Sequence, residues 1–127
     1  MGTGGNWYYL NSKISSLIWT DLQSWTSSNS IIIAGSTSNA TSGIVANHAY
    51  TLLNVYSVAV STTTYQLIKL RNPWGMTEWS GAFGDTDPFW AANPSIATQL
   101  GFANKNDGDF FISLSDFLNP NYFNFIT

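Results

Sequence analysis

The clearest helical pattern in the chain lies between residues 14 and 27. Apolar side chains recur there at spacings typical of one helix face: Ile14, Leu17, Ile18, Leu22 and Trp25. The pattern therefore predicts an amphipathic helix. Residues 30–34 are rich in isoleucine and predict a short strand. Residues 35–43 are rich in Ser, Thr, Asn and Gly and predict a loop.

Two β-rich runs in the middle of the chain predict a long hairpin. Residues 48–60 contain no proline or glycine, and residues 64–70 alternate in the manner of a strand. Residues 61–63 can turn the chain between them. Because the two strands run out and back, we expect His48 and Asn72 to lie together at the open end.

The remaining third of the chain is less regular. Residues 72–92 are rich in Gly, Pro and Trp and predict a long irregular segment, a kind that is often functional. Asn93-Pro94 predicts the start of a short helix that ends near Leu100. Residues 109–114 predict a strand, and Ser115 is expected to cap a final turn through Leu118.

Together these elements predict an α+β domain with a mostly antiparallel, barrel-like sheet and flanking helices. We expect residues 13–127 to form this domain and residues 1–12 to be a separate N-terminal segment, which cloning could have added. The chain has 127 residues and 44% of them are hydrophobic, enough for one domain with its own core.

Charge and cysteine content exclude several classes of function. Only 9% of residues are charged, the net charge is -3, and no basic run exists, which argues against a nucleic-acid partner. The sequence has no cysteine, so it holds no disulfide, thiolate metal site or cysteine nucleophile. We expect no transmembrane segment, because the longest apolar run is far too short, and no signal peptide.

His48 and Asn72 are the best candidates for chemistry. Each has a plainer interpretation: His48 as a structural histidine, and Asn72-Pro73 as a turn. Their expected proximity favours a joint role. The Asn72 side-chain oxygen could accept the imidazole N–H and orient the ring, as the third member of a Cys-His-Asn triad does. Trp74 could then shield that hydrogen bond from water.

Several motifs resemble, in order and spacing, the second subdomain of the calpain protease core. They are GIVANHAY (43–50), LIKLRNPWG (67–75), EWSG (78–81), NDGDFF (106–111) and SDF (115–117). Asn47 stands where the family usually has glycine, and Asp109 where glutamate is common.

The resemblance implies that the chain is the C-terminal half of a papain-like cysteine protease core. His48 would then be the catalytic histidine, Asn72 the catalytic asparagine, and Trp74 the tryptophan that shields the site. The nucleophilic cysteine would come from a preceding subdomain of the same parent chain. Because that subdomain is absent here, this chain alone is expected to be inactive.

Acidic residues are concentrated between positions 78 and 109. A solvated acidic surface is the plainer interpretation, but Asp107 and Asp109 flank a glycine, as in many calcium loops. An EF-hand is excluded, since its residue pattern is missing. The calpain resemblance implies one Ca²⁺, held by two loops whose ligands are Glu78, Asp85, Asp107, Asp109 and the carbonyl of Lys105. It further implies that calcium moves Trp74 out of the cleft.

The six tryptophans allow two interpretations, a sugar-binding platform or core packing. Trp19 and Trp25 lie on or near the apolar stripe of the predicted helix, which favours the core. Trp79 and Trp90 flank the predicted calcium loops and could support them. Without its preceding subdomain the chain should also expose apolar surface and self-associate.

The leading hypothesis is one half of a calcium-dependent, intracellular and cytoplasmic cysteine endopeptidase that acts on proteins and peptides. One alternative is a non-catalytic calpain-like module that binds calcium or a protein partner. Another is a calcium-bound carbohydrate-binding module, which would leave the His48 and Asn72 motifs unexplained.

Overall fold

The computed structural model describes residues 8–72, 79–102 and 108–126. In chain order the elements are β1 (Tyr8–Tyr9), the 3-10 helix η1 (Leu10–Ser12), α1 (Ser15–Ser27), β2 (Ile32–Ser36), β3 (Ala49–Val60), β4 (Thr63–Arg71), α2 (Pro88–Ala92), α3 (Pro94–Leu100), β5 (Asp109–Ser113), α4 (Leu114–Phe117) and β6 (Phe123–Ile126). Among these residues, no helix combines the length and apolar character needed to cross a membrane.

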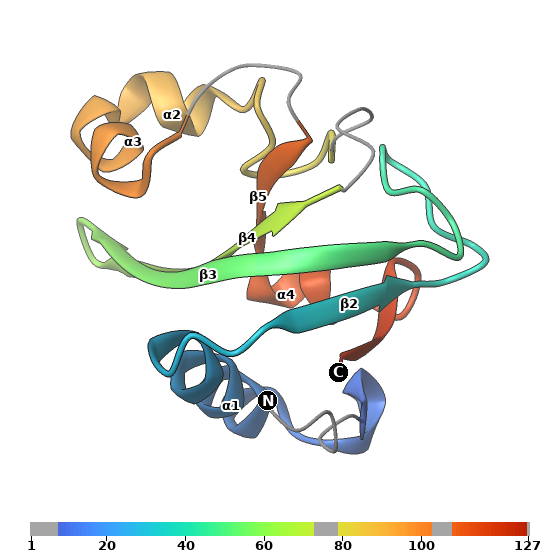
Figure 1. The fold of residues 1–127 in the computed structure, drawn as a ribbon. Helices are drawn as coiled ribbons and strands as arrows, with labels where there is room; N and C mark the ends of the chain where they lie inside the picture. Colours follow the sequence, from blue (N-terminus) through green and yellow to red (C-terminus); the bar gives the residue numbers. More distant parts are fainter. Residues whose placement is uncertain (1–7, 73–78, 103–107, 127) are drawn as a thin grey trace.

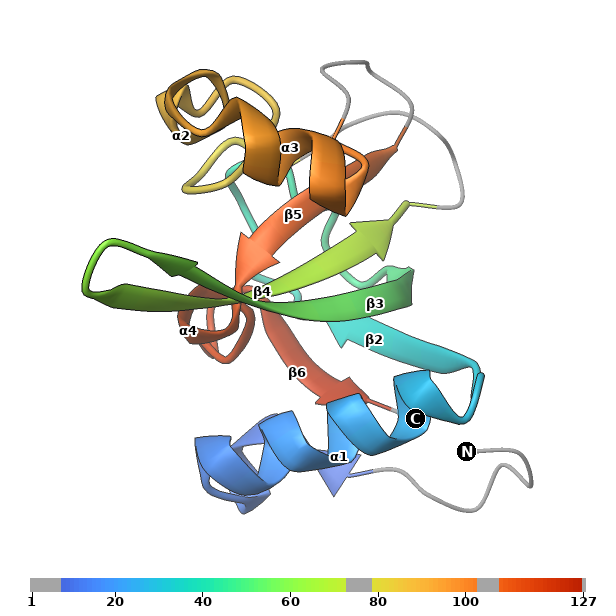
Figure 2. The same ribbon diagram turned by 90° about the vertical axis from the view of Figure 1, so that its left-hand side faces the viewer.

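The strands form one sheet in the order β1-β6-β2-β3-β4-β5, and every neighbouring pair is antiparallel. The long β3–β4 hairpin crosses the molecule, with α2 and α3 above it and α1 below it in Figure 1. In the view turned by 90°, the same helices lie on opposite sides of the twisted sheet (Figure 2). The predicted α+β fold with an antiparallel sheet and flanking helices is confirmed.

Each side of the sheet buries its own apolar cluster. One cluster joins α1 and α4 to the sheet, with Ile18, Leu22 and Phe117 packed near Tyr50 and Phe110. Alternate residues of the same strands face the second cluster, which α2 and α3 cover. Its buried members are Val58, Leu67, Phe83, Trp90, Leu100 and Phe111. Burying such a side chain contributes about 1.5–3 kcal/mol, so each cluster holds its helices firmly.

A β-bulge changes which residues of β3 face each cluster. The register of the β3–β4 pair shifts between Leu52 and Asn54. Before the shift, Tyr50 and Leu52 face the α1 cluster; beyond it, Val58 faces the α2–α3 cluster. An extra residue in one strand reverses which side chains point to which face, so even-numbered residues of β3 face the α1 cluster before the bulge and the α2–α3 cluster beyond it.

Several predicted elements are confirmed, with small shifts at their ends. They are the helix at 14–27, the hairpin, the helix after Asn93 and the strand from Asp109. The predicted cap of the last helix was wrong. The N-cap is Ser113, whose hydroxyl accepts a hydrogen bond from the Asp116 N–H at 3.1 Å. Since the helix already begins at Leu114, Ser115 lies inside it.

Two strands, the 3-10 helix η1 and the helix α2 were not predicted. β1 and β6 are short and pair with each other, and β6 also pairs with β2. Their strand character comes from partners distant in sequence. The pairing also brings Tyr8 and Tyr9 of the expected separate N-terminal segment into the sheet. Helix α2 did carry a local signal, because Asp87 caps it by accepting from the Phe89 N–H at 2.8 Å, with Pro88 at its first turn.

Candidate active site

His48 and Asn72 lie side by side at the open end of the β3–β4 hairpin. His48 directly precedes β3, and Asn72 directly follows β4. The His48 Nε2 and Asn72 Oδ1 atoms are 2.9 Å apart. Because an amide oxygen can only accept, Nε2 is the donor. In the neutral imidazole the lone pair is then on Nδ1, which is the nitrogen that can accept a proton.

Asn72 is held on the side of the sheet where β5 begins. Its side chain is almost completely buried, with 1% of the residue exposed. Its backbone N–H donates to the Gly108 carbonyl at 3.0 Å. Such burial keeps water from competing for the Asn72–His48 hydrogen bond, which is stronger in a region of low dielectric constant.

His48 is held from the opposite side, by β2 and by Tyr50. The His48 N–H donates to the Ser36 hydroxyl at 2.8 Å, and the Ser36 N–H donates to the His48 carbonyl at 2.9 Å. The imidazole packs edge-to-face with the Tyr50 ring, with centroids 5.1 Å apart. Sequence reasoning assigned no role to Ser36 or Tyr50. Tyr50 lies within the His-Ala-Tyr motif, whereas Ser36 reaches His48 only through the pairing of β2 with β3.

A surface cavity of about 370 Å³ adjoins His48. Its lining comes from three strands or their ends: Gly35, Ser36, Asn47, His48, Ala49, Asn124 and Phe125. The Phe125 ring lies so close over Gly35 that a Cβ atom added there would collide with it. The imidazole is thus half-buried beside an open space with an aromatic wall, which is where a reacting group from outside this chain could approach it.

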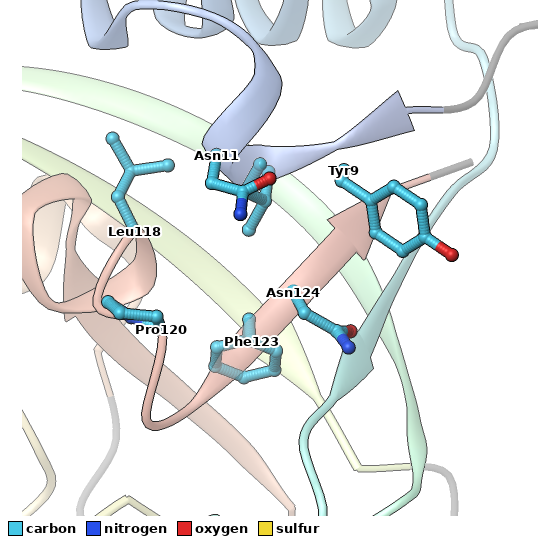
Figure 3. Close-up of a pocket in the computed structure, with 7 residues that line it drawn as sticks. Tyr9, Asn11, Leu118, Pro120, Phe123 and Asn124 are labelled. Atoms are coloured by element: carbon cyan, nitrogen blue, oxygen red, sulfur yellow. The ribbon is translucent and has the colours of Figure 1, made fainter.

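A second cavity, of about 380 Å³, lies between β1–η1 and the segment that joins α4 to β6 (Figure 3). It is lined by Tyr9, Leu10, Asn11, Leu118, Pro120, Phe123 and Asn124. The lining is largely apolar and holds no histidine, carboxylate or basic side chain. It therefore offers no group for acid–base or nucleophilic chemistry.

The predicted calcium ligands are only partly covered by the structure. Glu78, Lys105 and Asp107 lie outside the described residues, as does the predicted shielding residue Trp74. Asp85 is half-buried in the loop before α2. Within the described ranges, no three His, Cys, Asp or Glu side chains form a group that could hold a metal ion.

Asp109 has an ion-pair partner. Arg71 Nε donates to Asp109 Oδ1 at 2.7 Å, and Arg71 Nη2 donates to Oδ2 at 3.0 Å. This two-pronged geometry is the strongest that arginine and a carboxylate adopt. Arg71 thus occupies one acceptor position on each Asp109 oxygen, and the remaining lone pairs are those that could face a cation.

Tryptophans of the described segments belong to the core. Trp79 is 4% exposed and Trp90 is 3% exposed. The Trp79 indole N–H donates to the Ala82 carbonyl at 2.8 Å, and that of Trp90 donates to the carbonyls of Phe83 and Gly84. Neither ring is available to stack on a sugar, so these residues give no support to a carbohydrate-binding module.

Comparison with known proteins identifies the family. The family model described as calpain family cysteine protease matches residues 2–127. The chain belongs to the calpain family of cysteine proteases. It is 40% identical to human calpain-12 over 76 residues, 60% of this chain and 11% of that protein.

Other calpains match a similar stretch. Identity to the mouse calpain-2 catalytic subunit is 38% over 76 residues, 59% of this chain and 11% of that subunit. Identity to calpain-B of Drosophila melanogaster is 37% over 83 residues, 61% of this chain and 9% of that protein. The chain thus spans only about a tenth of the length of these relatives. It is a fragment of a calpain catalytic domain, and it lacks the cysteine on which the family's chemistry depends.

Proposed function

We propose that this chain is the histidine-and-asparagine half of a cysteine endopeptidase, completed by a cysteine-bearing subdomain of the same parent chain. The observation that supports this most directly is the 2.9 Å contact between His48 Nε2 and Asn72 Oδ1. In a member of a cysteine protease family, this contact gives the imidazole the tautomer that a general base needs.

The geometry suggests how the pair would work on a peptide bond. His48 Nδ1 takes the proton of the incoming thiol, which leaves a thiolate next to an imidazolium. The thiolate attacks the peptide carbonyl carbon, and the same proton passes from His48 to the leaving amine. Water, deprotonated by His48, then hydrolyses the thioester. Asn72 keeps Nε2–H engaged throughout, so that Nδ1 remains the nitrogen that exchanges the proton.

Reconstitution tests this proposal. The chain is mixed with the separately produced cysteine-bearing subdomain of its parent, and hydrolysis of a fluorogenic peptide is measured. We expect activity from the complex only, a loss of about a thousandfold or more in kcat for His48→Ala, and about a hundredfold for Asn72→Ala. Formation of a stable complex that cleaves nothing would contradict the proposal.

The same result would favour the alternative function, a non-catalytic module that binds calcium or a protein partner. The absence of cysteine from this chain is compatible with that alternative. A binding module, however, has no need of a buried asparagine that orients a histidine. The leading proposal includes protein and peptide substrates, which substrate profiling of the complex tests. It also includes a cytoplasmic location, which fractionation of expressing cells tests.

Calcium dependence is a separate part of the proposal. Glu78, Asp85, Asp107 and the Lys105 carbonyl would supply oxygen ligands of the kind that Ca²⁺ prefers, together with the Asp109 lone pairs that Arg71 does not occupy. The bound ion would supply a positive charge that draws the two loops together. Calorimetric titration with Ca²⁺, with Mg²⁺ as control, should show saturable binding that Asp107→Ala abolishes. If Mg²⁺ bound as well as Ca²⁺, or if Asp107→Ala bound Ca²⁺ as well as the wild type, the calcium part of the proposal would be contradicted.

A further inference from the structure

Two buried hydroxyl groups hold the loop that leads into β3. Ser36 is 6% exposed, and Tyr50 is fully buried. Both side chains reach residues 45–48, the last residues of the loop before the strand. Among the described residues, Ser36 and Asn72 are also the two polar residues classed as buried. Buried polar groups of this kind specify a local structure because each must find its partner.

At the end of the ladder between β2 and β3, the Ser36 hydroxyl takes the place of the Ser36 backbone carbonyl as hydrogen-bond acceptor. The last regular pair is Gly35 with Ala49. One step further, the Ser36 N–H still bonds the His48 carbonyl, but the His48 N–H donates to the Ser36 hydroxyl at 2.8 Å. The hydroxyl in turn has two carbonyl acceptors within hydrogen-bond distance, that of Val45 and, at 3.1 Å, that of His48. A register shift against β6 falls between Gly35 and Ser36, and such shifts redirect side chains.

Tyr50 holds the same loop from the other direction. The Val45 N–H donates to the Tyr50 hydroxyl at 2.8 Å. Side-chain hydroxyls therefore bind both the N–H and the carbonyl of Val45. The Tyr50 ring is fixed in turn by edge-to-face contacts with Phe110 and Phe123, at centroid distances of 5.9 and 5.5 Å. Its opposite contact is the His48 imidazole at 5.1 Å.

The loop needs such support because its backbone is unusual. Asn47, which directly precedes His48, has φ of 52°. That region is uncommon for residues other than glycine and persists where surrounding contacts determine it. The Asn47 N–H donates to the Thr37 carbonyl at 3.1 Å, but the bonds made by Ser36 and Tyr50 hold the residues on either side.

We propose that Ser36 and Tyr50 are positioning residues, which clamp residues 45–48 so that the imidazole of His48 meets Asn72 through Nε2. Neither would touch the reacting atoms. The catalytic value of this arrangement rests on the proposed function, but the arrangement itself is a property of this chain and can be tested without a cysteine.

The test is nitrogen-15 NMR of the imidazole in the 127-residue chain. Since His48 is the only histidine, its ring signals need no assignment by mutation. With the ring neutral, the wild-type chain should show mainly the Nε2–H tautomer. In Ser36→Ala and in Tyr50→Phe, the Nδ1–H tautomer should gain, and the Nε2 proton should exchange with solvent about tenfold faster. Ser36→Thr, which keeps the hydroxyl, should restore the wild-type spectrum.

Ser113→Ala is the matched control. It also removes a serine hydroxyl that accepts a backbone N–H, but at the cap of α4, where Ser113 pairs with Leu67. An unchanged tautomer and exchange rate in both Ser36→Ala and Tyr50→Phe would overturn the inference. So would the same change in Ser113→Ala, which would indicate general loosening. Should Ser36→Ala not fold, Tyr50→Phe, which keeps the ring, decides the question alone.

Activity of the reconstituted complex separates this inference from the proposed function. If both hold, Ser36→Ala and Tyr50→Phe lower kcat about tenfold with little change in KM, since they disturb orientation and not substrate binding. If the complex is inactive but the tautomer shifts as expected, the proposed function fails and the clamp stands. If the complex is active and neither variant affects the tautomer or kcat, the clamp fails and the function stands.

Discussion

The two ends of the β3–β4 hairpin are built from different kinds of residue. At the open end, His48 makes hydrogen bonds to Ser36 of β2 and to Asn72, which directly follows β4, and Asn72 is held in turn by the Gly108 carbonyl before β5. Toward the turn, aromatic rings of β4, β5, α2 and the segments beside α2 and α3 pack together: Tyr65, Phe83, Phe89, Trp90, Phe102 and Phe111. Figure 1 shows these two helices above the half of the hairpin that ends in the turn.

This difference separates stability from orientation. Apolar burial is strong but non-directional, so the turn end can hold the domain together without defining any atom closely. Hydrogen bonds contribute less free energy each but require particular distances and angles. Substitutions at the turn end should therefore affect mainly folding, and those at the open end mainly the geometry of the imidazole.

The largest loss of stability is expected from Trp90→Ala. Trp90 is 3% exposed and stacks on Phe102 at a centroid distance of 4.4 Å. Its truncation should lower the free energy of unfolding by about 3–5 kcal/mol, as measured by urea denaturation. In the folded fraction, the imidazole spectrum of His48 should remain that of the wild type. Trp25→Ala, at a half-buried position, should cost clearly less; equal losses would mean that the burial of Trp90 does not account for its contribution.

Asn72→Ala should have a smaller effect on stability than Trp90→Ala but a large effect on the imidazole of His48. It removes the partner of His48 Nε2 but keeps the backbone bond to Gly108. We expect a loss of about 1–2 kcal/mol in unfolding free energy, together with a large change in the tautomer of His48. Urea denaturation and NMR on the same sample measure both. A wild-type tautomer in this variant would show that Asn72 does not orient the ring.

A smaller effect is expected from Arg71→Met, which breaks the ion pair with Asp109. The Arg71 side chain is 53% exposed, so solvent screens the pair even though its geometry is good. The free energy of unfolding should fall by less than about 1 kcal/mol, and by still less in high salt. Lys13→Met, which breaks the 3.5 Å pair with Asp21 on α1, is a control for a weaker contact. A loss of several kcal/mol would mean that the ion pair, and not apolar packing, secures the start of β5.

The smallest effect concerns alkaline pH. Burial raises the pKa of Tyr50 above its usual value of 10.0, and the hydrogen bond from Val45 partly opposes this. A raised pKa in the folded state means that the folded chain keeps the proton longer than the unfolded chain. The stability linked to Tyr50 is therefore complete below pH 10 and is lost as the pH rises through the folded-state pKa. Unfolding measured from pH 8 upwards should show this loss in the wild type and a shallower slope in Tyr50→Phe.

Local patterns predicted most of the main elements. The apolar spacing of residues 14–27 and the β-rich runs before and after residues 61–63 correspond to α1 and to the hairpin. From the hairpin alone it followed that His48 and Asn72 would lie close together. The bulge after Leu52 could not be predicted from these patterns, because residues 48–60 have the pattern of one continuous strand. Only the packing against two cores shows where the side chains of this strand switch faces.

The sequence by itself thus determined the family, the fold class and the residue pair that meets at the open end, since these depend on motifs and on periodicity within one segment. Only the tertiary structure decided what holds that pair. Ser36 is 12 positions from His48, Gly108 is 36 positions from Asn72, and the arginine that pairs with Asp109 lies 38 positions away. Hydrogen bonds between distant strands depend on register, which is set when the sheet assembles and both faces are buried. For that reason the pairing of His48 with Asn72 could be predicted from the order of residues, whereas the contacts that orient the pair could not.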